Sequence, residues 1–308
     1  MILSASRRTD LPCYYSDWLL NRLRAGYVLV RNPFNHAQLS RVPLSPEVVD
    51  CIVFWTKDPQ NMLDKLPLLD QMGYRYYFQF TLTPYDRSLE KGLRDKSEVE
   101  STFIALSQQL GRERVVWRYD PIILNEVLDI PYHRRQFERL ASKLAGFTDT
   151  VVISFVDTYQ KLKSTGIRPL SVSEIGELAG IIGRLAASYG LRAVACCENM
   201  NLTSYGIQQS SCIDRARIEK ICGAKLLLPA DQNQRQGCGC VQSVDIGAYN
   251  TCLNGCVYCY ANRGTALAEK NYRCHDPNGP LLFGTVSETD KITLREAKSN
   301  LILQTALF

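Results

Sequence analysis

Several common signatures of catalysis and membrane insertion are missing from this sequence. No run of eighteen apolar residues occurs, so the sequence excludes a membrane-spanning segment. The serine-nucleophile, phosphate-loop and dinucleotide-binding glycine motifs are also missing, which argues against a hydrolase, a kinase and a dehydrogenase. Histidine is scarce, and His36, His133 and His275 follow no spacing pattern, so we assign them no chemistry. The surroundings of His133, Pro-Tyr-His-Arg-Arg, predict the exposed start of a helix.

The charge is mild and the N-terminus does not resemble a secretion signal. The formal net charge is +5, which is too small to indicate nucleic-acid binding by itself. The basic pair of Arg7 and Arg8 follows a very short apolar run, the reverse of the order in a signal peptide. With 308 residues, 45% of them hydrophobic, the chain can bury one large core. We therefore expect a cytoplasmic protein built around one domain of barrel size.

Cysteine, in contrast, is abundant and unevenly distributed. Of the 12 cysteines, Cys13 and Cys51 lie far from the others and are expected to be small buried hydrophobic residues. The other cysteines crowd the C-terminal part of the chain: Cys196, Cys197, Cys212, Cys222, Cys238, Cys240, Cys252, Cys256, Cys259 and Cys274. Structural disulfides are not expected in a reducing cytoplasm, which leaves metal sites, catalysis or packing as explanations.

The most specific motif is the C-x-x-x-C-x-x-C run of Cys252, Cys256 and Cys259, with Tyr258 and Tyr260 flanking its last cysteine. Three thiolates on one loop can hold three corners of a 4Fe-4S cubane and leave the fourth iron free for a small molecule. Two-cluster ferredoxins use C-x-x-C-x-x-C and zinc ribbons use paired C-x-x-C, so the longer first gap argues against both. A zinc site or a chance cluster remains the alternative.

The scaffold is predicted to be an α/β fold. Up to about residue 200, short apolar or aromatic runs alternate with helical patterns, as in a parallel sheet with crossover helices. The seven predicted strands are Ile2–Ser6, Tyr27–Arg31, Cys51–Thr56, Tyr76–Thr81, Val115–Tyr119, Val151–Phe155 and Arg192–Cys196. Capping boxes at Ser97-x-x-Glu100 and Ser171-x-x-Glu174 mark two helix starts. We expect Leu39–Leu44 to form a hairpin or an insertion.

An eighth strand, Val241–Ile246, lies immediately before the cysteine motif and completes the set for a (β/α) TIM-like barrel. We divide the chain into a barrel body, residues 1–236, a last strand with the cysteine loop, residues 237–275, and a tail, residues 276–308. The capping box Thr293-x-x-Glu296 predicts a short helix in the tail.

The chain resembles an uncharacterised family of bacterial proteins whose C-terminal cysteines are similar to the N-terminal cluster of radical S-adenosylmethionine (SAM) enzymes. The stretches that carry the resemblance are Ser6–Asp10, Phe54–Pro59, Trp117–Pro121 and the run from Gly237 to Asn262. In radical SAM barrels the cluster loop follows the first strand, whereas here it would follow the last. Because the first and last strands of a closed barrel are neighbours, the order indicates a circular permutation of that barrel.

The resemblance implies a cofactor and a reaction class. Cys252, Cys256 and Cys259 would bind a 4Fe-4S cluster, and the main chain of Tyr258 would lie against the adenine of SAM. Reduction by an electron donor such as flavodoxin or ferredoxin would cleave SAM to methionine and a 5′-deoxyadenosyl radical, which abstracts hydrogen from an unknown substrate. The Gly-Gly-Glu stretch that usually contacts SAM in such enzymes does not follow Ile2–Ser6.

Polar residues at the ends of the predicted strands are the candidates for the remaining catalytic and SAM-binding roles, because barrel active sites lie at that edge. They are Arg7, Arg8, Asp10, Lys57, Arg118, Asp120 and Glu198. A further set, Cys197, Cys212, Cys238 and Cys240, is the candidate for a second iron-sulfur cluster or a zinc site. In the alternative interpretation these thiols only pack or form a redox pair, and Cys196 and Cys222 are core residues.

Two rival functions stay open. The first is a non-radical iron-sulfur or zinc-binding barrel protein, and the second is a nucleic-acid repair or modification enzyme. The C-terminal Gln304–Phe308 resembles the short Gln-x-x-Leu-Phe peptides that dock on bacterial sliding clamps, which would favour a nucleic-acid substrate. Packing of Leu303, Leu307 and Phe308 against the barrel is the alternative for this tail.

Overall fold

A large parallel sheet organises the chain. The computed structural model describes residues 1–157, 162, 165–198, 200–235 and 237–302. Eight strands pair in the order β11 (Val244–Asp245), β1 (Ile2–Ala5), β4 (Cys51–Thr56), β5 (Tyr76–Thr81), β6 (Val115–Ile122), β7 (Thr150–Phe155), β8 (Arg192–Ala195) and β9 (Gln208–Gln209). Every pairing in this sheet is parallel. The predicted α/β class with a parallel sheet is therefore confirmed.

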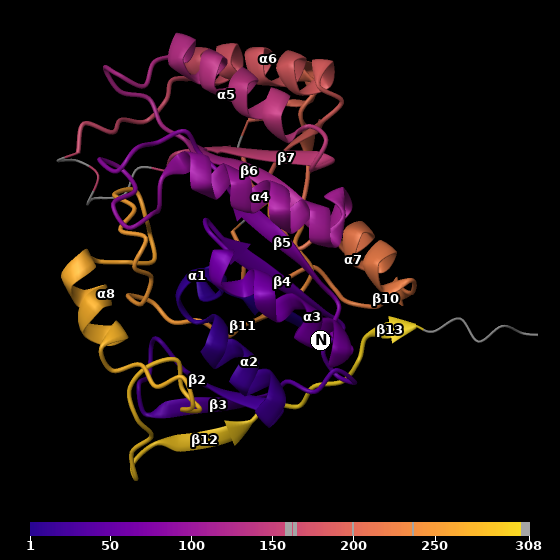
Figure 1. Cartoon of the computed structure of the whole chain (residues 1–308), viewed down its shortest axis with the longest axis vertical. Helices are drawn as coiled ribbons and strands as arrows, with labels where there is room; N and C mark the ends of the chain where they lie inside the picture. Colours follow the sequence, from indigo (N-terminus) through magenta and orange to yellow (C-terminus); the bar gives the residue numbers. More distant parts are fainter. Residues whose placement is uncertain (158–161, 163–164, 199, 236, 303–308) are drawn as a thin grey trace, which may run out of the picture.

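Helices connect the strands, as the alternating sequence pattern predicts. They are α1 (Leu11–Tyr14), α2 (Ser16–Ala25), α3 (Leu66–Gln71), α4 (Lys96–Leu110), α5 (Ile130–Leu144), α6 (Val172–Ser188), α7 (Arg215–Cys222) and α8 (Thr265–Tyr272). Figure 1 shows α5 and α6 side by side at one end of the molecule and α8 at its edge. The capping box at Ser171 is confirmed, but α4 begins earlier than predicted because Asp95 and Glu98 form its capping box.

Alternate residues of the strands face two different layers. Leu3, Phe54, Phe78 and Trp117 belong to the core shared with helices such as α2 and α5, which we call the outer face. Ile2, Val53, Tyr77, Val116 and Val152 belong to a second core on the inner face, together with Cys212, Ile218 and Val241. The segment from Cys212 to Val241, which includes α7, thus covers the inner face. This two-sided burial explains why the strands are nearly continuous apolar runs.

One predicted barrel strand belongs to a different sheet. Tyr27–Arg31 forms β2, which pairs antiparallel with β3 (Gln38–Pro43). The connection between them is short, and a short loop permits antiparallel pairing, whereas a parallel neighbour needs a long crossover. The hairpin expected at Leu39–Leu44 is thus confirmed, and the place of Tyr27–Arg31 in the barrel is wrong.

The tail also differs from its prediction. The sequence around Thr293 forms β12 (Lys291–Leu294), which pairs in parallel with β3, instead of a helix opened by Thr293 and Glu296. Pairing with the exposed edge of β3 overrides the capping signal (Figure 1). Farther on, β13 (Leu301–Ile302) pairs with β10 (Lys225–Leu226). Leu303 and the clamp-like Gln304–Phe308 lie outside the described residues.

The eighth predicted strand lies where the sequence analysis places it. Within Val241–Ile246, Val244 pairs with Leu3 and Asp245 with Ser4, in parallel register. Ser4 of β1 and Ser6, just after it, hold this edge, because Ser6 Oγ donates to Asp245 Oδ1 at 2.6 Å and Ser4 Oγ donates to Asp245 Oδ2 at 3.1 Å. In the described part of the chain β9 and β11 are the two ends of the sheet order, so a closed barrel and its permutation stay predictions.

The expectations for the isolated cysteines and for His133 have opposite outcomes. Cys13 and Cys51 are buried, as expected. His133, expected at an exposed helix start, is fully buried, with Nδ1 2.8 Å from the Tyr119 hydroxyl and Nε2 2.8 Å from the Ile123 carbonyl oxygen. It lies on the apolar side of α5, where the side chain satisfies two buried polar groups. Among the helices that the structure describes, none has the length and apolar character needed to cross a membrane.

Candidate functional site

The cysteine loop begins just after β11, at the carboxyl edge of the sheet and beside the end of β1. Cys252 is buried, and Cys256 and Cys259 are partly exposed. The three thiols lie close enough for each to influence the charge of the others. They do not form the tight group expected around one ion. Among the described residues, the group of three whose ligand atoms all lie within 4.8 Å of one another is Cys196, Cys238 and Cys240.

Tight backbone contacts hold the loop in place. Gly92 N donates to the Asn254 carbonyl oxygen at 2.9 Å, and Val257 N donates to the Leu89 carbonyl oxygen at 2.9 Å. A Cβ atom at Gly92 would overlap the carbonyl oxygen of Leu253, so glycine is required for this close approach. Tyr15 Oη adds a 2.7 Å hydrogen bond to the Thr251 carbonyl oxygen. The loop is therefore packed against the segment that follows β5.

Asp10 anchors the loop from the other side. Its Oδ2 accepts hydrogen bonds from Lys57 N at 2.7 Å and from Asn254 Nδ2 at 3.0 Å, and its Oδ1 accepts one from Cys13 N at 3.1 Å as the cap of α1. Burial raises the pKa of Asp10 to about 6, although these hydrogen bonds oppose the shift. Asp10, predicted as a catalytic candidate, thus lies next to the cysteine loop with its oxygens occupied by protein donors.

Behind Cys256 lies a buried charged cluster made of Lys57, Glu90, Lys96 and Tyr258. Lys57 Nζ contacts Glu90 Oε1 at 2.7 Å and Tyr258 Oη at 3.0 Å, and both Lys96 and Tyr258 also donate to Glu90. Burial alone would raise the pKa of Glu90, but the two ammonium groups outweigh it and lower that pKa to about 2. The predicted residues Lys57 and Tyr258 are therefore brought together beside the cysteine loop.

Arg7 follows β1 and lies between the cysteine loop and the inner face of the sheet. Its backbone N donates to Asp245 Oδ2 at 2.9 Å, and its carbonyl oxygen accepts a 2.7 Å hydrogen bond from Tyr260 Oη. Its guanidinium lies 5.2 Å from the ring centroid of Trp55. Arg7 Nη2 and Trp55 Nε1 are both buried without a hydrogen-bond partner among the described residues. Buried donors of this kind are uncommon and indicate where a ligand or water binds.

Arg8 lies farther out than Arg7. Its guanidinium stacks over Tyr249, with 5.0 Å between the guanidinium carbon and the ring centroid. Its Nη1 donates a long, 3.5 Å hydrogen bond to the Gly247 carbonyl oxygen. Arg8 therefore joins the rim around the loop before Cys252, and Arg7 points inward.

Arg118 and Asp120 continue the polar layer along β6. Arg118 Nε donates to Asp120 Oδ2 at 2.9 Å, and its Nη1 contacts Gln79 Oε1 at 3.2 Å. Ser154 Oγ also donates to Asp120. Glu198 Oε1 accepts a 3.0 Å hydrogen bond from Phe155 N, and burial, aided by the charge of Asp120, raises the pKa of Glu198 to about 7. These polar groups lie at the carboxyl ends of β6, β7 and β8.

The second cysteine group differs from its prediction by one residue. Cys238 and Cys240 gather with Cys196, and the Cys212 thiol interacts with those of Cys196 and Cys240. Cys197 has a positive φ of 61° and its Sγ lies 4.0 Å from the Arg235 carbonyl oxygen, outside the group of three. Strand alternation was the signal that could have found Cys196, because Val194 faces the inner core and residue 196 repeats its direction.

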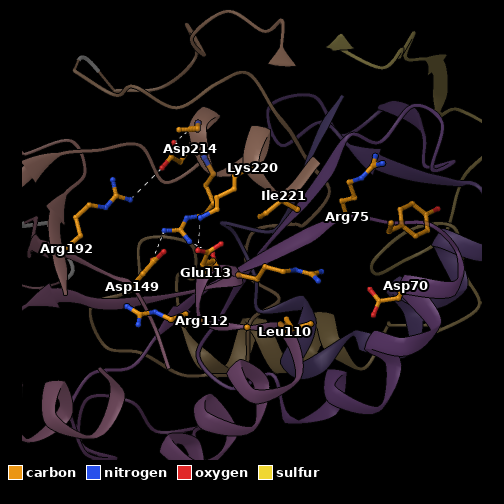
Figure 2. A pocket seen from close by; sticks show the side chains of 15 residues that line it. Asp70, Arg75, Leu110, Arg112, Glu113, Asp149, Arg192, Asp214, Lys220 and Ile221 are labelled. Atoms are coloured by element: carbon orange, nitrogen blue, oxygen red, sulfur yellow. Dashed lines mark hydrogen bonds and ion pairs between the residues drawn. The ribbon is translucent and has the colours of Figure 1, made fainter. Parts of the chain in front are cut away.

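A separate pocket of about 640 Å³ lies at the opposite, amino-terminal edge of the strands (Figure 2). Several of its cations already have acidic partners. Arg217 contacts Asp149 at 2.9 Å and Lys220 contacts Glu113 at 2.6 Å. In barrel-like folds this edge contributes to stability rather than chemistry. We therefore place the candidate site at the carboxyl edge, where the cysteine loop lies.

Comparisons with known proteins place the chain in a family. A search of curated proteins finds no match. One solved structure, assigned as an alpha-L-fucosidase from Bacteroides thetaiotaomicron VPI-5482, aligns over 75% of this chain and 85% of its own length. Its sequence identity is 10% and its TM-score 0.27, a level of similarity that supports no inference about this chain. The family model described as a domain of unknown function (DUF1848) matches residues 2–261, so the chain belongs to the DUF1848 family.

Proposed function

We propose that this protein is a radical SAM-type iron-sulfur enzyme in which Cys252, Cys256 and Cys259 hold a 4Fe-4S cluster. The carrying observation is the parallel pairing of β11 with β1, which brings the three-cysteine loop to the carboxyl edge of the sheet. Ligands of parallel α/β sheets bind at that edge. The polar residues Arg7, Lys57, Asp120 and Glu198 lie at the same edge.

The spacing of the three thiols fits a cluster better than a single ion. Sulfurs that bind different irons of a cubane lie farther apart than two sulfurs on one metal ion. The three thiols influence each other's charge, but they are not among the groups within 4.8 Å in the described part of the chain. Burial raises the pKa of Cys252 to about 12, so this thiol stays protonated unless a bound cation stabilises its thiolate.

Backbone donors and a buried cation support negative charge on this loop. Ala261 N donates to Cys259 Sγ at 3.3 Å, and the backbone of Asp10 and Asn254 donates to Cys252. Lys57 lies near Cys256, where its ammonium favours the thiolate. Hydrogen bonds and charges around cluster ligands tune such centres. The residues of the loop therefore fit the proposed group.

The remaining residues are proposed to bind and orient ligands. When bound, the reduced cluster supplies the electron that cleaves SAM to a 5′-deoxyadenosyl radical, and a flavodoxin or ferredoxin supplies that electron in turn. Arg7 Nη2 and Trp55 Nε1 offer two buried donors to an acceptor such as a carboxylate. Glu198, whose pKa is raised to about 7, can exchange a proton with substrate near neutral pH. The Lys57–Glu90 pair positions the loop from behind.

The test is anaerobic reconstitution of the full chain with iron and sulfide. We expect about four iron and four sulfide per chain bound through the loop. Cys256→Ala should lose this cluster, whereas Cys274→Ala, a control at an exposed cysteine outside both groups, should keep it. Equal iron content in the Cys256→Ala protein and the wild type would contradict the proposal.

The second cysteine group favours an alternative, a metal-binding barrel protein without radical chemistry. Cys196, Cys238 and Cys240 lie within 4.8 Å of one another, which suits a metal independently of SAM. A protein that binds metal but leaves SAM intact under reducing conditions would support this alternative.

A further inference from the structure

We propose that Cys196, Cys212, Cys238 and Cys240 form a closed, four-thiolate site for a single zinc ion. The site would fix the segment that covers the inner face of the sheet. It does not rest on the proposed radical chemistry, because none of its four cysteines belongs to the loop of Cys252, Cys256 and Cys259.

The spacing of the thiols points to one ion. Two sulfurs on a tetrahedral zinc ion, each about 2.3 Å from the metal, lie about 3.8 Å apart. The sulfurs of Cys196, Cys238 and Cys240 all lie within 4.8 Å of one another, close to that separation. The Cys212 thiol interacts with those of Cys196 and Cys240 but lies outside the group of three. The proposal makes it the fourth ligand. To complete a tetrahedron, the first three sulfurs would move slightly closer together and Cys212 would move toward them.

The surroundings of the four cysteines suit a negatively charged centre. Four thiolates and one divalent ion carry a net charge of about −2. Arg118, a buried residue, donates from Nη1 to Cys212 Sγ at 3.0 Å, and Arg7 lies near enough to Cys240 and Cys212 for their charges to attract. Ile213 N donates to Cys240 Sγ at 3.3 Å. Arg7, the amide of Ile213 and Arg118, which is also paired with Asp120, therefore face the thiolates and favour their negative charge.

The ligands come from three separate parts of the chain. Cys196 follows β8, Cys212 precedes α7, and Cys238 and Cys240 lie between β10 and β11. Ala230 and Val241 make an isolated bridge in that last connection, which the structure describes except for residue 236. A Cβ atom at Gly239, between the two cysteines, would lie 2.6 Å from Ser211 Oγ, so this loop packs closely against the residue before Cys212.

A metal at this position would hold together the loops that carry the four cysteines. Four protein ligands leave no open coordination position, which is typical of structural zinc rather than catalytic zinc. Cys212 and Cys240 are buried among inner-face residues such as Val194 and Val241, and Cys196 and Cys238 are partly exposed. We infer that zinc binding locks the covering segment onto the inner face and keeps Arg7 and Arg118 in place there.

The test uses the full chain with Cys252, Cys256 and Cys259 all changed to Ala, so that only the second group can bind metal. Titration with Co²⁺ should give the visible bands of a tetrahedral thiolate site and saturate at one ion per chain, and Zn²⁺ should displace the cobalt. A cobalt spectrum without tetrahedral bands would overturn the proposal. So would four iron and four sulfide bound in this background, because they would indicate a cluster instead of one ion.

Adjacent cysteines provide a matched pair of variants in the same background. Cys196→Ser should weaken Co²⁺ binding by at least about 100-fold, since it removes a ligand, whereas Cys197→Ser should change it by less than about 2-fold. The reverse order would overturn the assignment. Circular dichroism establishes that each variant is folded. If Cys196→Ser does not fold, the number of thiolate ligands is read from the protein that carries only the three alanine substitutions. Its thiolate-to-cobalt charge-transfer band should have the intensity of four thiolates, which absorb more strongly than two. SAM cleavage enters none of these readouts.

Discussion

The carboxylate of Asp10 accepts a 3.0 Å hydrogen bond from the side-chain amide of Asn254, 244 residues away in the sequence. Tyr14 Oη donates to the other atom of that amide group, Asn254 Oδ1, at 2.9 Å. The segment after β1 and the cysteine loop are thus joined by side chains as well as by the pairing of β1 with β11.

Replacing Asp10 with Ala should loosen the cysteine loop. The change removes the cap of α1 and leaves the amide of Asn254 without its buried acceptor, so we expect the free energy of unfolding to fall by about 2 kcal/mol. Urea denaturation measures this loss. The variant should also retain less iron after reconstitution. Asp17→Ala, at an exposed acid of α2, is the control. An Asp10→Ala protein as stable as that control would show that the anchor is unimportant.

Gly92→Ala should disturb the loop by steric overlap alone. The added Cβ would meet the carbonyl oxygen of Leu253, a backbone atom that cannot move without shifting the loop. We expect a loss of about 1–3 kcal/mol in stability, typical of an overpacked site. Gly146→Ala is the matched control, since nothing lies within 4 Å of the added atom there. Thermal unfolding that ranks Gly146→Ala as the more damaging change would contradict this interpretation.

Lys57→Met should lower the free energy of unfolding, because it removes a partner of the buried carboxylate of Glu90. Glu90 would keep Lys96 but lose its 2.7 Å partner, and its ionised form would be left partly uncompensated in a buried site. We expect a loss of about 3 kcal/mol, the scale found when one member of a buried ion pair is removed. Lys143→Met, which removes a half-exposed partner of Glu100, should cost less than about 1 kcal/mol. Denaturant unfolding of the two variants provides the comparison.

His133 should make the protein sensitive to mild acid. Burial lowers the pKa of His133, although the Ile123 carbonyl and Asp129 oppose the shift. The unfolded chain therefore binds a proton near pH 6.5 before the folded chain does, so stability is present above that pH and is lost as the pH falls toward the folded pKa.

The loss due to His133 approaches about 1.4 kcal/mol per pH unit between the unfolded and folded pKa values. His133→Gln should flatten the decline in unfolding free energy between pH 7 and pH 5, and His36→Gln, at an exposed histidine, should not. A decline that is equally steep in the His133→Gln protein would show that other groups cause the acid sensitivity.

The strands and the cysteine loop were predictable because their signals are local. Apolar runs such as Cys51–Thr56 are buried on both faces. The pairing of Val244 with Leu3 was predicted from a count of eight strands that wrongly included Tyr27–Arg31 and lacked β9. The place of Tyr27–Arg31 was not predictable from such signals. This segment pairs with β3 through a short connection, and β3 pairs in turn with β12 from the distant tail. Periodicity alone does not distinguish two sheets.

The candidate site was predictable in part for similar reasons. Polar residues at strand ends, such as Lys57 and Arg118, lie at one edge because parallel strands end together. Glu90 was missed, since it precedes α4 on a loop and gains its importance only from Lys57, Lys96 and Tyr258 folding around it. Cys197 was chosen instead of Cys196 because it was taken as the residue that ends the strand, whereas side-chain alternation along β8 turns residue 196 to the inner face with Val194.

The most direct test of the account is reductive cleavage of SAM by the reconstituted protein. Under anaerobic conditions with a strong one-electron reductant, the wild type should convert SAM to 5′-deoxyadenosine and methionine, detected by chromatography and mass spectrometry. Cys256→Ala should form no more than the reagent blank, and Cys274→Ala should match the wild type. A wild-type protein that holds a full 4Fe-4S complement yet forms no 5′-deoxyadenosine above the blank would contradict the proposed function.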